Sequence, residues 1–318
     1  MEADLQTTSE DIQTISTAAN DFLRNNKASR LPLLSFTPWS TRKIRKQKEA
    51  ENAPVVDRLH RELIREVVDT EIDGVPAAVI TPNSLDPALA DAAALYVHGG
   101  AFLMGSAVDP LALLMADALG ITVVSMAYSL SPEAVFPVAL EETLQVYSEF
   151  IADHPPGRTV IFGVSAGGNL VLSTLLEAWK NNLPMPAAAG LFTPWTDLTG
   201  SGDSYRGNDG RDCVIAWKNQ LDKAARCYIG TEDPTDPRIS PIYAKYPEVF
   251  PPTIITTGTR DLFLSDCTRL YWILRSAGTR AALRVWEGMW HAFNVEPDIT
   301  EGRHAREEVA EFLVRALC

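Results

Sequence analysis

Gly163-Val164-Ser165-Ala166-Gly167 is the stretch of sequence that decides the fold. An apolar run at residues 159–162 precedes it, and residues 168–172 can begin a helix. A Gly-x-Ser-x-Gly sequence between a strand and a helix is typical of a nucleophile elbow, in which a sharp turn holds the serine in a strained conformation with its hydroxyl exposed. Small residues on either side let the strand and the helix approach each other closely. The pattern predicts that Ser165 is a catalytic nucleophile.

A second motif lies earlier in the chain, directly after a predicted strand at residues 92–97. It reads His98-Gly99-Gly100-Ala101-Phe102, a loop of the His-Gly-Gly-Gly type with alanine in the last glycine position. Main-chain N–H groups of such a loop stabilise the oxygen that becomes negative in a tetrahedral intermediate, together with the N–H that follows the nucleophile. The candidate donors are therefore Gly99, Gly100, Ala101 and Ala166. His98 is interpreted as a structural hydrogen-bonding residue rather than a base.

An acid and a histidine follow in the order that a serine hydrolase of this type requires. Asp261 comes just after a predicted strand at residues 252–257, and His291 lies in the loop after the next strand, at residues 282–286. Parallel strands place such loops at the same sheet edge as the serine. The sequence therefore predicts a catalytic triad of Ser165, Asp261 and His291. Asp266 is an alternative acid, although we expect it to lie already in the following helix.

Strands and helices alternate along most of the chain. We expect a hairpin over residues 63–81 around Asp73-Gly74, a favourable turn pair. Further strands are expected near residues 92–97, 121–127, 159–162, 187–192, 252–257 and 282–286, with helices near 111–119, 138–153, 167–181, 265–277 and 301–317. This alternation predicts an α/β fold with a mostly parallel central sheet and helices on both faces.

One long insertion interrupts the alternation. About sixty residues separate the strands that end near Phe192 and begin at Pro252, which is far more than an ordinary loop needs. Residues 201–211 are rich in Gly, Asp and Ser, and residues 215–228 are expected to be helical. Because long ordered loops often act as lids, we expect any opening motion at residues 200–210.

The N-terminal region contains a predicted helix from about Ser9 to Asn25 and a basic run at residues 42–48. The chain as a whole is acidic, with a net charge of −13 over 318 residues. This balance argues against nucleic acid or an anionic membrane as a partner, so the basic run is interpreted as a solvated helix face.

Several classes of protein are disfavoured by what the sequence lacks. Cys213, Cys227, Cys267 and Cys318 show no metal-ligand spacing and are interpreted as free thiols of a reducing compartment. The first residues lack the pattern of a signal peptide, and there is no apolar run of about 18 residues that could span a membrane. We therefore expect a cytoplasmic protein, and the predicted chemistry needs no metal or organic cofactor.

Together these motifs resemble the hormone-sensitive-lipase-like family of α/β-hydrolases, which are serine carboxylesterases and lipases. The resemblance covers roughly residues 60–318 and also rests on segments 128–133, 136–141, 193–198, 258–261 and 288–291. The chain departs from the family pattern at Ala101, Val164 and Ser129, none of which belongs to the predicted triad.

The resemblance implies an α/β-hydrolase fold with a helical cap over the active site. It implies an N-terminal cap segment at residues 1–55 and a catalytic domain at residues 56–318, with a cap insertion at about 197–240. Among the oxyanion donors it points most to Gly100, Ala101 and Ala166.

The implied activity is hydrolysis of small to medium apolar carboxylic esters through an acyl-enzyme intermediate. A lactonase, or an amidase or deacetylase on the same triad, is an alternative, and a non-catalytic ligand-binding protein is a further one. The family also implies a possible homodimer through the last strand, around residues 281–287.

Overall fold

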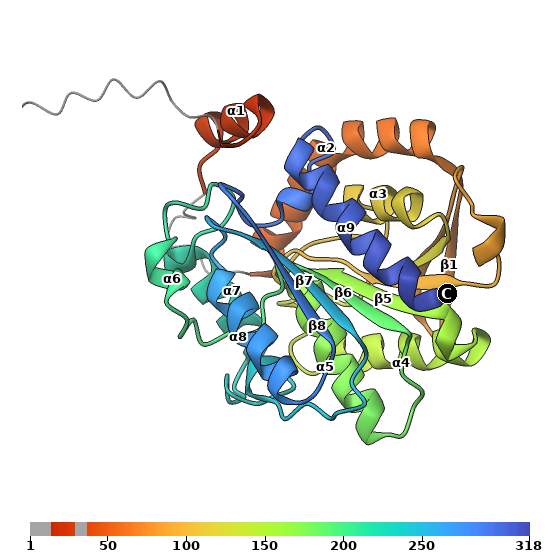
Figure 1. The fold of residues 1–318 in the computed structure, drawn as a ribbon. Coiled ribbons are helices and arrows are strands. Elements are labelled where there is room, and N and C mark those ends of the chain that lie inside the picture. The colour runs from red at the N-terminus through yellow and green to blue at the C-terminus, as the bar shows by residue number, and fades with distance from the viewer. Residues whose placement is uncertain (1–13, 29–36) are drawn as a thin grey trace, which may run out of the picture.

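The computed structural model describes residues 14–28 and 37–318, and within them eight strands form one sheet in the order β1-β2-β4-β3-β5-β6-β7-β8 (Figure 1). β2 pairs antiparallel with β1 and β4, and the strands from β4 to β8 pair parallel. The predicted mostly parallel sheet is therefore confirmed. The strands are β1 (Ile64–Ile72), β2 (Val75–Pro82), β3 (Ala93–Val97), β4 (Thr122–Met126), β5 (Thr159–Val164), β6 (Ala188–Phe192), β7 (Thr253–Gly258) and β8 (Ala281–Trp286).

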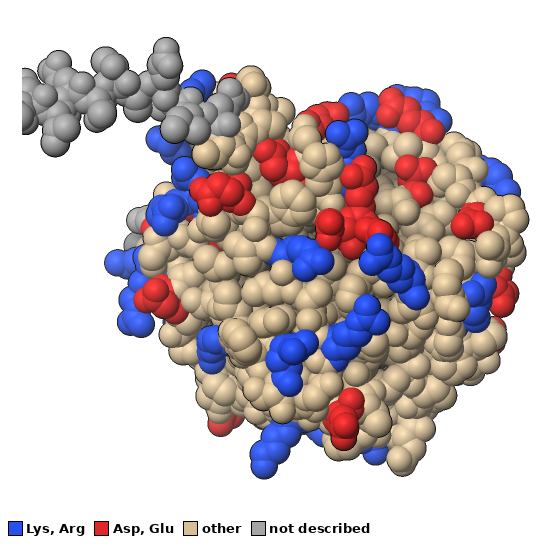
Figure 2. Space-filling view, viewed as in Figure 1, with Lys and Arg blue, Asp and Glu red and all other residues tan. Residues whose placement is uncertain are grey.

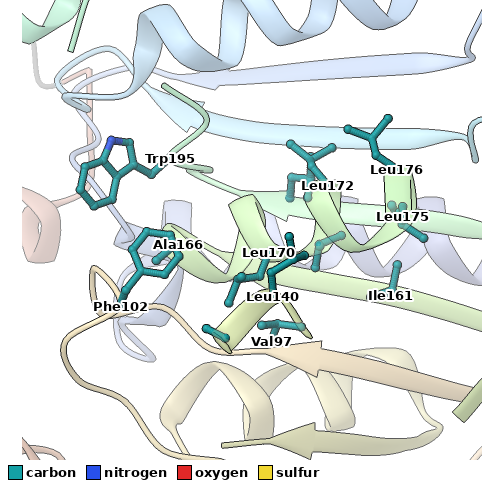
Figure 3. Close-up of a cluster of buried hydrophobic side chains, with 14 of the residues drawn as sticks. Val97, Phe102, Leu140, Ile161, Ala166, Leu170, Leu172, Leu175, Leu176 and Trp195 are labelled. Atoms are coloured by element: carbon teal, nitrogen blue, oxygen red, sulfur yellow. The ribbon is translucent and has the colours of Figure 1, made fainter. Parts of the chain in front are cut away.

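Helices cover both faces of the sheet, as predicted (Figure 1). α3 and α9 lie on one face, with α2 packed on α3, while α4, α5 and α8 lie on the other. Figure 3 shows part of the core beneath α5, where Leu170 and Leu172 meet Val97 and Ile161 of the sheet. The helices are α1 (Thr17–Asn25), α2 (Pro38–Leu63), α3 (Pro110–Leu119), α4 (Val138–Asp153), α5 (Ala166–Lys180), α6 (Ser204–Gly207), α7 (Asp222–Ile229), α8 (Leu264–Ser276) and α9 (Thr300–Leu317).

The carboxyl ends of the parallel strands meet at one edge of the sheet. Gly163 near the end of β5 pairs with Val97, the last residue of β3, and with Leu191 on β6. Gly258 at the end of β7 pairs with Trp286 at the end of β8. The loops that follow these strands therefore start side by side, at the edge where open α/β sheets bind their ligands.

The hairpin at the start of the sheet forms as its turn residues predict. Asp73 and Gly74 connect β1 to β2 and have positive φ angles of 48° and 84°. A two-residue turn with positive φ at both positions matches the right-handed twist of the strands that it joins.

Two expectations about the helices differ from the structure. The predicted helix over residues 215–228 is wrong in its first half, because Lys218 (ψ 123°) and Asn219 (φ 67°) leave the helical region and α7 starts only at Asp222. Of the predicted helix from Ser9 to Asn25, α1 forms the second half, while residues 9–13 lie outside the described residues. α2 runs without interruption through residue 55, the predicted end of the N-terminal cap segment.

The face that carries α8, α9 and β8 shows acidic and basic side chains interspersed rather than gathered by sign (Figure 2). Within residues 14–28 and 37–318, none of the helices combines the length and the apolar character needed to cross a bilayer.

Candidate active site

Ser165 occupies a sharp turn between β5 and α5. Its backbone has φ 55° and ψ −120°, a region that costs on the order of 1–3 kcal/mol for a residue with a side chain. The turn is held on both sides, because the Ser165 N–H donates to the Phe192 carbonyl at 2.9 Å and its carbonyl accepts the Trp195 N–H at 3.0 Å. Ser165 is thus fixed at the carboxyl edge of the sheet in the conformation expected of a nucleophile elbow.

The glycines of the elbow are required by close backbone contacts. A Cβ atom on Gly167 would lie 2.0 Å from the Val97 carbonyl oxygen, and one on Gly163 would lie 2.6 Å from the Gly167 oxygen. Neither contact is possible for a larger residue, so the elbow pattern in the sequence reflects the packing of β5 and α5 against β3.

The loop after β3 packs against the serine. A Cβ atom on Gly99 would lie 3.3 Å from the Ser165 Cβ, so the Gly99 backbone passes directly beside the nucleophile. The next three residues, Gly100, Ala101 and Phe102, have positive φ angles of 109°, 56° and 60°. Successive turns of this kind gather backbone N–H groups into a concave surface that binds anions. The structure therefore brings the candidate oxyanion loop together with Ser165.

His98 lies at the start of this loop and is buried. Its Nδ1 atom donates to the Gly99 carbonyl at 2.7 Å, and its ring stacks on Tyr128 with 4.2 Å between the ring centroids. Loss of solvent lowers the pKa of His98 to about 4, since burial disfavours the charged imidazolium. A neutral, hydrogen-bonded His98 agrees with the structural role expected from the sequence.

Asp261 and His291 lie in contact at the same sheet edge. The Nδ1 atom of His291 is 3.1 Å from Oδ1 of Asp261. Asp261 is fully buried, and its other oxygen accepts the Thr257 hydroxyl at 2.6 Å, while the Phe263 N–H donates to Oδ1 at 3.0 Å. These bonds fix the carboxylate so that it faces the imidazole.

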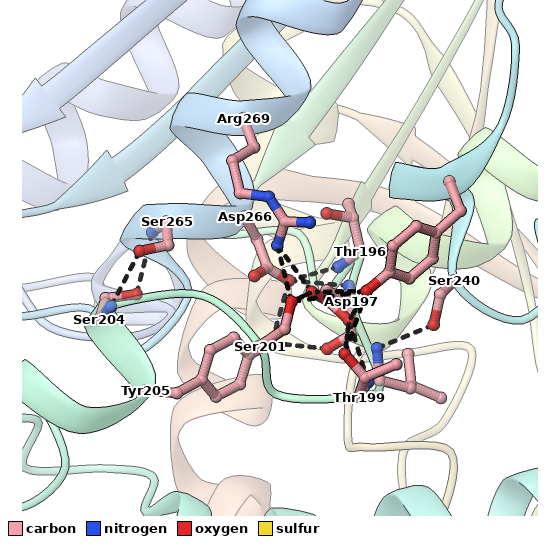
Figure 4. A network of polar contacts seen from close by, with 12 residues as sticks. Thr196, Asp197, Thr199, Ser201, Ser204, Tyr205, Ser240, Ser265, Asp266 and Arg269 are labelled. Carbon is pink, nitrogen blue, oxygen red and sulfur yellow. Dashed lines mark hydrogen bonds and ion pairs between the residues drawn. The ribbon is translucent and has the colours of Figure 1, made fainter. Parts of the chain in front are cut away.

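Asp266, the alternative acid, belongs to a different network, shown in Figure 4. It lies in the first turn of α8, where its Oδ2 atom accepts the N–H groups of Thr196 and Asp197, each at 2.9 Å, and the Tyr205 hydroxyl at 3.0 Å. Burial, together with the charge of Asp197, raises the pKa of Asp266 well above its ordinary value. Asp266 therefore braces the loop after β6 and does not contact the histidine.

Aromatic side chains connect the serine to the acid–histidine pair. Trp195, whose backbone N–H donates to the Ser165 carbonyl, stacks on Phe263 with 5.4 Å between centroids, and Phe263 meets the His291 ring edge-on at 4.8 Å. Figure 3 shows Trp195 and Phe102 side by side next to Ala166, at the start of α5. A continuous chain of contacts thus runs from the backbone of Ser165 to the His291 ring.

The insertion between β6 and β7 completes the aromatic surface. Tyr228 of α7 stacks on Phe102 with 3.7 Å between centroids and an interplanar angle of 5°. Phe102, Trp195 and Tyr228 are at most 1% exposed, and Ser165 itself is only 7% exposed. The nucleophile is therefore largely shielded from solvent, next to a buried aromatic cluster.

Sequence reasoning missed two polar residues of the insertion, Asn208 and Asp212. The Asp212 carboxylate accepts the backbone N–H groups of His291 and Leu262, both at 3.1 Å. The Asn208 amide donates to the Asp261 carbonyl at 2.8 Å. Their only signal was a cluster of Asn and Asp in a segment without helical or strand periodicity. These contacts anchor the segment that was expected to open.

Burial raises the pKa of Asp212 to about 6. The positive charge that His291 carries when protonated acts in the opposite direction, and the charge of Asp261 raises the pKa further. Asp212 is therefore electrostatically coupled to both residues of the acid–histidine pair.

Two N-terminal helices also contact residues beside the site. Phe22 of α1 stacks on Trp290, next to His291, with 4.4 Å between centroids and an interplanar angle of 3°. Trp290 therefore packs under α1. Ser16, which caps α1, donates to Glu301 from its N–H at 2.6 Å and from its hydroxyl at 2.8 Å.

Arg45 of α2 is not a solvated residue of the basic run. Its guanidinium donates to the carbonyls of Leu103 and Ser131, both at 2.7 Å, and to both oxygens of Glu133. The interpretation of this run as a wholly solvated helix face is therefore wrong at Arg45.

Among the residues that the structure describes, no group of three or more His, Cys, Asp or Glu side chains is arranged to hold a metal ion. The four cysteines, Cys213, Cys227, Cys267 and Cys318, are free.

Comparison with known proteins agrees with this geometry. The family model of the alpha/beta hydrolase fold matches residues 94–295. LipR of Mycobacterium tuberculosis is 34% identical over 247 residues, which are 77% of this chain and 78% of LipR. An acetyl-hydrolase of Streptomyces hygroscopicus is 31% identical over 223 residues, covering 69% of this chain and 74% of that protein.

The fold also matches a solved structure over nearly its whole length. The crystal structure of a hormone-sensitive lipase from a metagenome library superimposes with a TM-score of 0.82 at 28% identity, and the match covers 96% of this chain and all of that one. The chain thus belongs to the hormone-sensitive-lipase-like family of α/β-hydrolases.

Proposed function

We propose that this carboxylic ester hydrolase acts through a covalent acyl-enzyme on Ser165, with His291 as general base and Asp261 as the acid that orients it. The observation that carries the proposal is the 3.1 Å contact between His291 and Asp261 at the sheet edge that also holds the Ser165 elbow. A nucleophile, a base and an acid that orients the base are the parts that acyl transfer requires.

The proposed mechanism has two halves. Ser165 attacks the ester carbonyl while His291 takes its proton and then passes a proton to the leaving alcohol. Water, activated by the same histidine, then attacks the acyl-enzyme and releases the carboxylic acid. Asp261 keeps the imidazole in the required tautomer and stabilises the imidazolium that forms.

The negative oxygen of each tetrahedral intermediate is assigned to the backbone N–H groups of Gly100, Ala101 and Ala166, with Gly99 beside them. This assignment is supported by the loop of residues with positive φ angles that passes next to Ser165. One such donor typically contributes about 2.7–4 kcal/mol of transition-state stabilisation.

We infer that the preferred substrates are esters of short carboxylic acids. Phe102, Trp195 and Tyr228 form a buried aromatic group beside the Ser165 elbow, and the serine is only 7% exposed. A long acyl chain would have to displace this buried aromatic group. That one relative is named an acetyl-hydrolase supports the same substrate class.

The arrangement of the rest of the chain remains a proposal. Residues 1–55 and about 197–240 are proposed to form the cap. A cytoplasmic location is proposed because the four cysteines are free, as is usual in a reducing compartment. β8 is an edge strand with Val285 46% exposed, so it is the proposed contact of a homodimer. Size-exclusion chromatography coupled to light scattering would measure the mass in solution.

Hydrolysis of p-nitrophenyl esters from C2 to C12 tests the function, with Ser165→Ala beside the wild-type enzyme. We expect a maximum at the shortest chains and a loss of roughly 10⁴-fold or more in kcat for Ser165→Ala. Ser173→Ala, at a buried serine within α5, is the matched control and should stay active. Equal activity of Ser165→Ala and the wild type would refute the nucleophile, and a folded chain inactive on every ester would favour a ligand-binding protein.

A further inference from the structure

We propose that Asn208 and Asp212 form a clamp through which the insertion sets the spacing of the acid and histidine loops, and that Asp212 is a positioning residue for catalysis. The inference rests on the proposed roles of Asp261 and His291. It assigns a function to the part of the insertion that carries Asn208 and Asp212, which otherwise resembles a polar connecting loop.

One carboxylate oxygen joins the two loops directly. Oδ2 of Asp212 accepts the N–H of Leu262, which follows the acid, and the N–H of His291, each at 3.1 Å. The other oxygen, Oδ1, accepts the N–H groups of Val214 and Ile215 at 2.9 and 3.2 Å. Asp212 is only 2% exposed, so water cannot replace these bonds.

Asn208 holds the same acid loop by its carbonyl groups. Its Nδ2 atom donates to the carbonyls of Asp261 and Thr259 at 2.8 and 3.2 Å. The Asp212 N–H in turn donates to the Asn208 carbonyl at 3.0 Å, so the two residues are fixed to each other. The acid loop is therefore held through both its donors and its acceptors by residues only four positions apart.

This arrangement requires a carboxylate at position 212. An asparagine has one acceptor oxygen and one donor NH2 group. Whichever way that amide turned, its NH2 group would face either the N–H groups of Leu262 and His291 or those of Val214 and Ile215. Asp212→Asn therefore keeps the size of the side chain but breaks one side of the clamp.

The clamp acts on the distance between Asp261 and His291. Asp261 and His291 are thirty positions apart in the sequence, and each belongs to a loop. Oδ2 of Asp212 contacts the backbone next to the acid and the backbone of the histidine itself. It therefore holds the two loops together beside the acid and the histidine, in addition to the bond from the Arg260 N–H to the Met289 carbonyl at 2.9 Å. Small displacements of such groups lower the rate of the chemical step more than they lower substrate binding.

The test is Asp212→Asn compared with Asp209→Asn. Asp209 is in the same segment and accepts a backbone N–H, that of Trp217 at 3.2 Å, so it is the matched control. Active sites are first counted by stoichiometric titration with a chromogenic organophosphate. Then kcat and KM for p-nitrophenyl acetate are measured per titrated site, and thermal unfolding is recorded for each variant.

We expect Asp212→Asn to lower kcat per titrated site by on the order of 10- to 100-fold with little change in KM. Asp209→Asn should keep the wild-type kcat per site. A merely structural role would reduce the number of titratable sites or the melting temperature and leave kcat per site unchanged, and that result would overturn the proposal.

Should Asp212→Asn fail to fold, Asn208→Ser provides the second test. It removes the amide from the carbonyls of Asp261 and Thr259 and leaves the Asp212 carboxylate in place. A lowered kcat per site would support the clamp, and an unchanged value would refute it. If instead the wild-type chain hydrolysed no ester, the proposed function itself would fail, and with it the basis of the clamp.

Discussion

Arg45 and Leu103 join α2 to the candidate oxyanion loop, with 2.7 Å between the Arg45 Nε atom and the Leu103 carbonyl oxygen. The same guanidinium contacts both oxygens of Glu133. The loop beside Ser165 is therefore held from outside by a helix that precedes the whole sheet in the sequence. A lysine at position 45 could not make these contacts at once, because it lacks the planar fork of arginine.

We expect Arg45→Lys to lower the free energy of unfolding by about 1–2 kcal/mol, since charge-assisted hydrogen bonds to a half-buried arginine are lost. Urea denaturation of Arg45→Lys and of Arg42→Lys, an exposed arginine of the same helix, would measure the difference. Equal effects of the two substitutions would show that the Arg45 contacts contribute nothing to the free energy of unfolding.

The two aspartates after β7 should respond very differently to the same substitution. Asp261→Asn is expected to lower kcat by about 10⁴-fold, because the amide no longer holds the imidazole in the required tautomer. Asp266→Asn should keep most of the activity, because its carbonyl can still accept the N–H groups of Thr196 and Asp197. Steady-state kinetics of both variants decide the matter, and the reverse order would identify Asp266 as the acid.

Ala101 is held at φ 56°, where an L-residue is strained by about 1–2 kcal/mol. Ala101→Gly relieves this strain but adds about 0.4–1 kcal/mol of unfolded-state entropy. We expect a net stabilisation of roughly 0.5–1 kcal/mol in urea denaturation. Ala90→Gly, at an exposed alanine with φ −60°, should instead destabilise the protein, and a stabilised Ala90→Gly would contradict this account.

The pKa of His98, lowered to about 4 by burial, predicts an imidazole that stays neutral down to about pH 5. The unfolded chain takes up a proton on this residue near pH 6.5, so its contribution to stability is fully present above that pH. The contribution is lost as the pH falls from about 6.5 towards 4. Nitrogen-detected NMR of the histidine rings would follow the titration, and a His98 signal that titrated near pH 6.5 would refute a buried neutral ring.

Much of the fold and of the proposed triad follows from short-range patterns in the sequence. The elbow at Ser165 is recognisable because its glycines are required by contacts that recur wherever a strand turns sharply into a helix. Asp261 and His291 can be predicted as site residues because each closely follows an apolar strand. The order of the strands was not predicted, since β3 and β4 exchange places in the sheet without any local signal.

The contacts that the sequence did not reveal all span long separations. Asp212 meets His291 across 79 positions, and Arg45 meets Leu103 across 58. Neither residue lies in a periodic pattern that would mark its partner. Composition also did not reveal the hydrogen bonds within residues 200–210, because a segment rich in Gly, Asp and Ser carries no pattern that marks the partners of Asn208.

The stacking of Phe22 on Trp290 sets an order of events during synthesis. Ser16, which caps α1, and its partner Glu301 are 285 positions apart, so α1 is translated long before the residues on which it docks. The helix must therefore wait, undocked, until Trp290 and Glu301 have been translated, and the histidine loop has no support from α1 before then. A ribosome-bound chain stalled before residue 286 lacks His291 as well as Trp290, and we expect it to hydrolyse no ester.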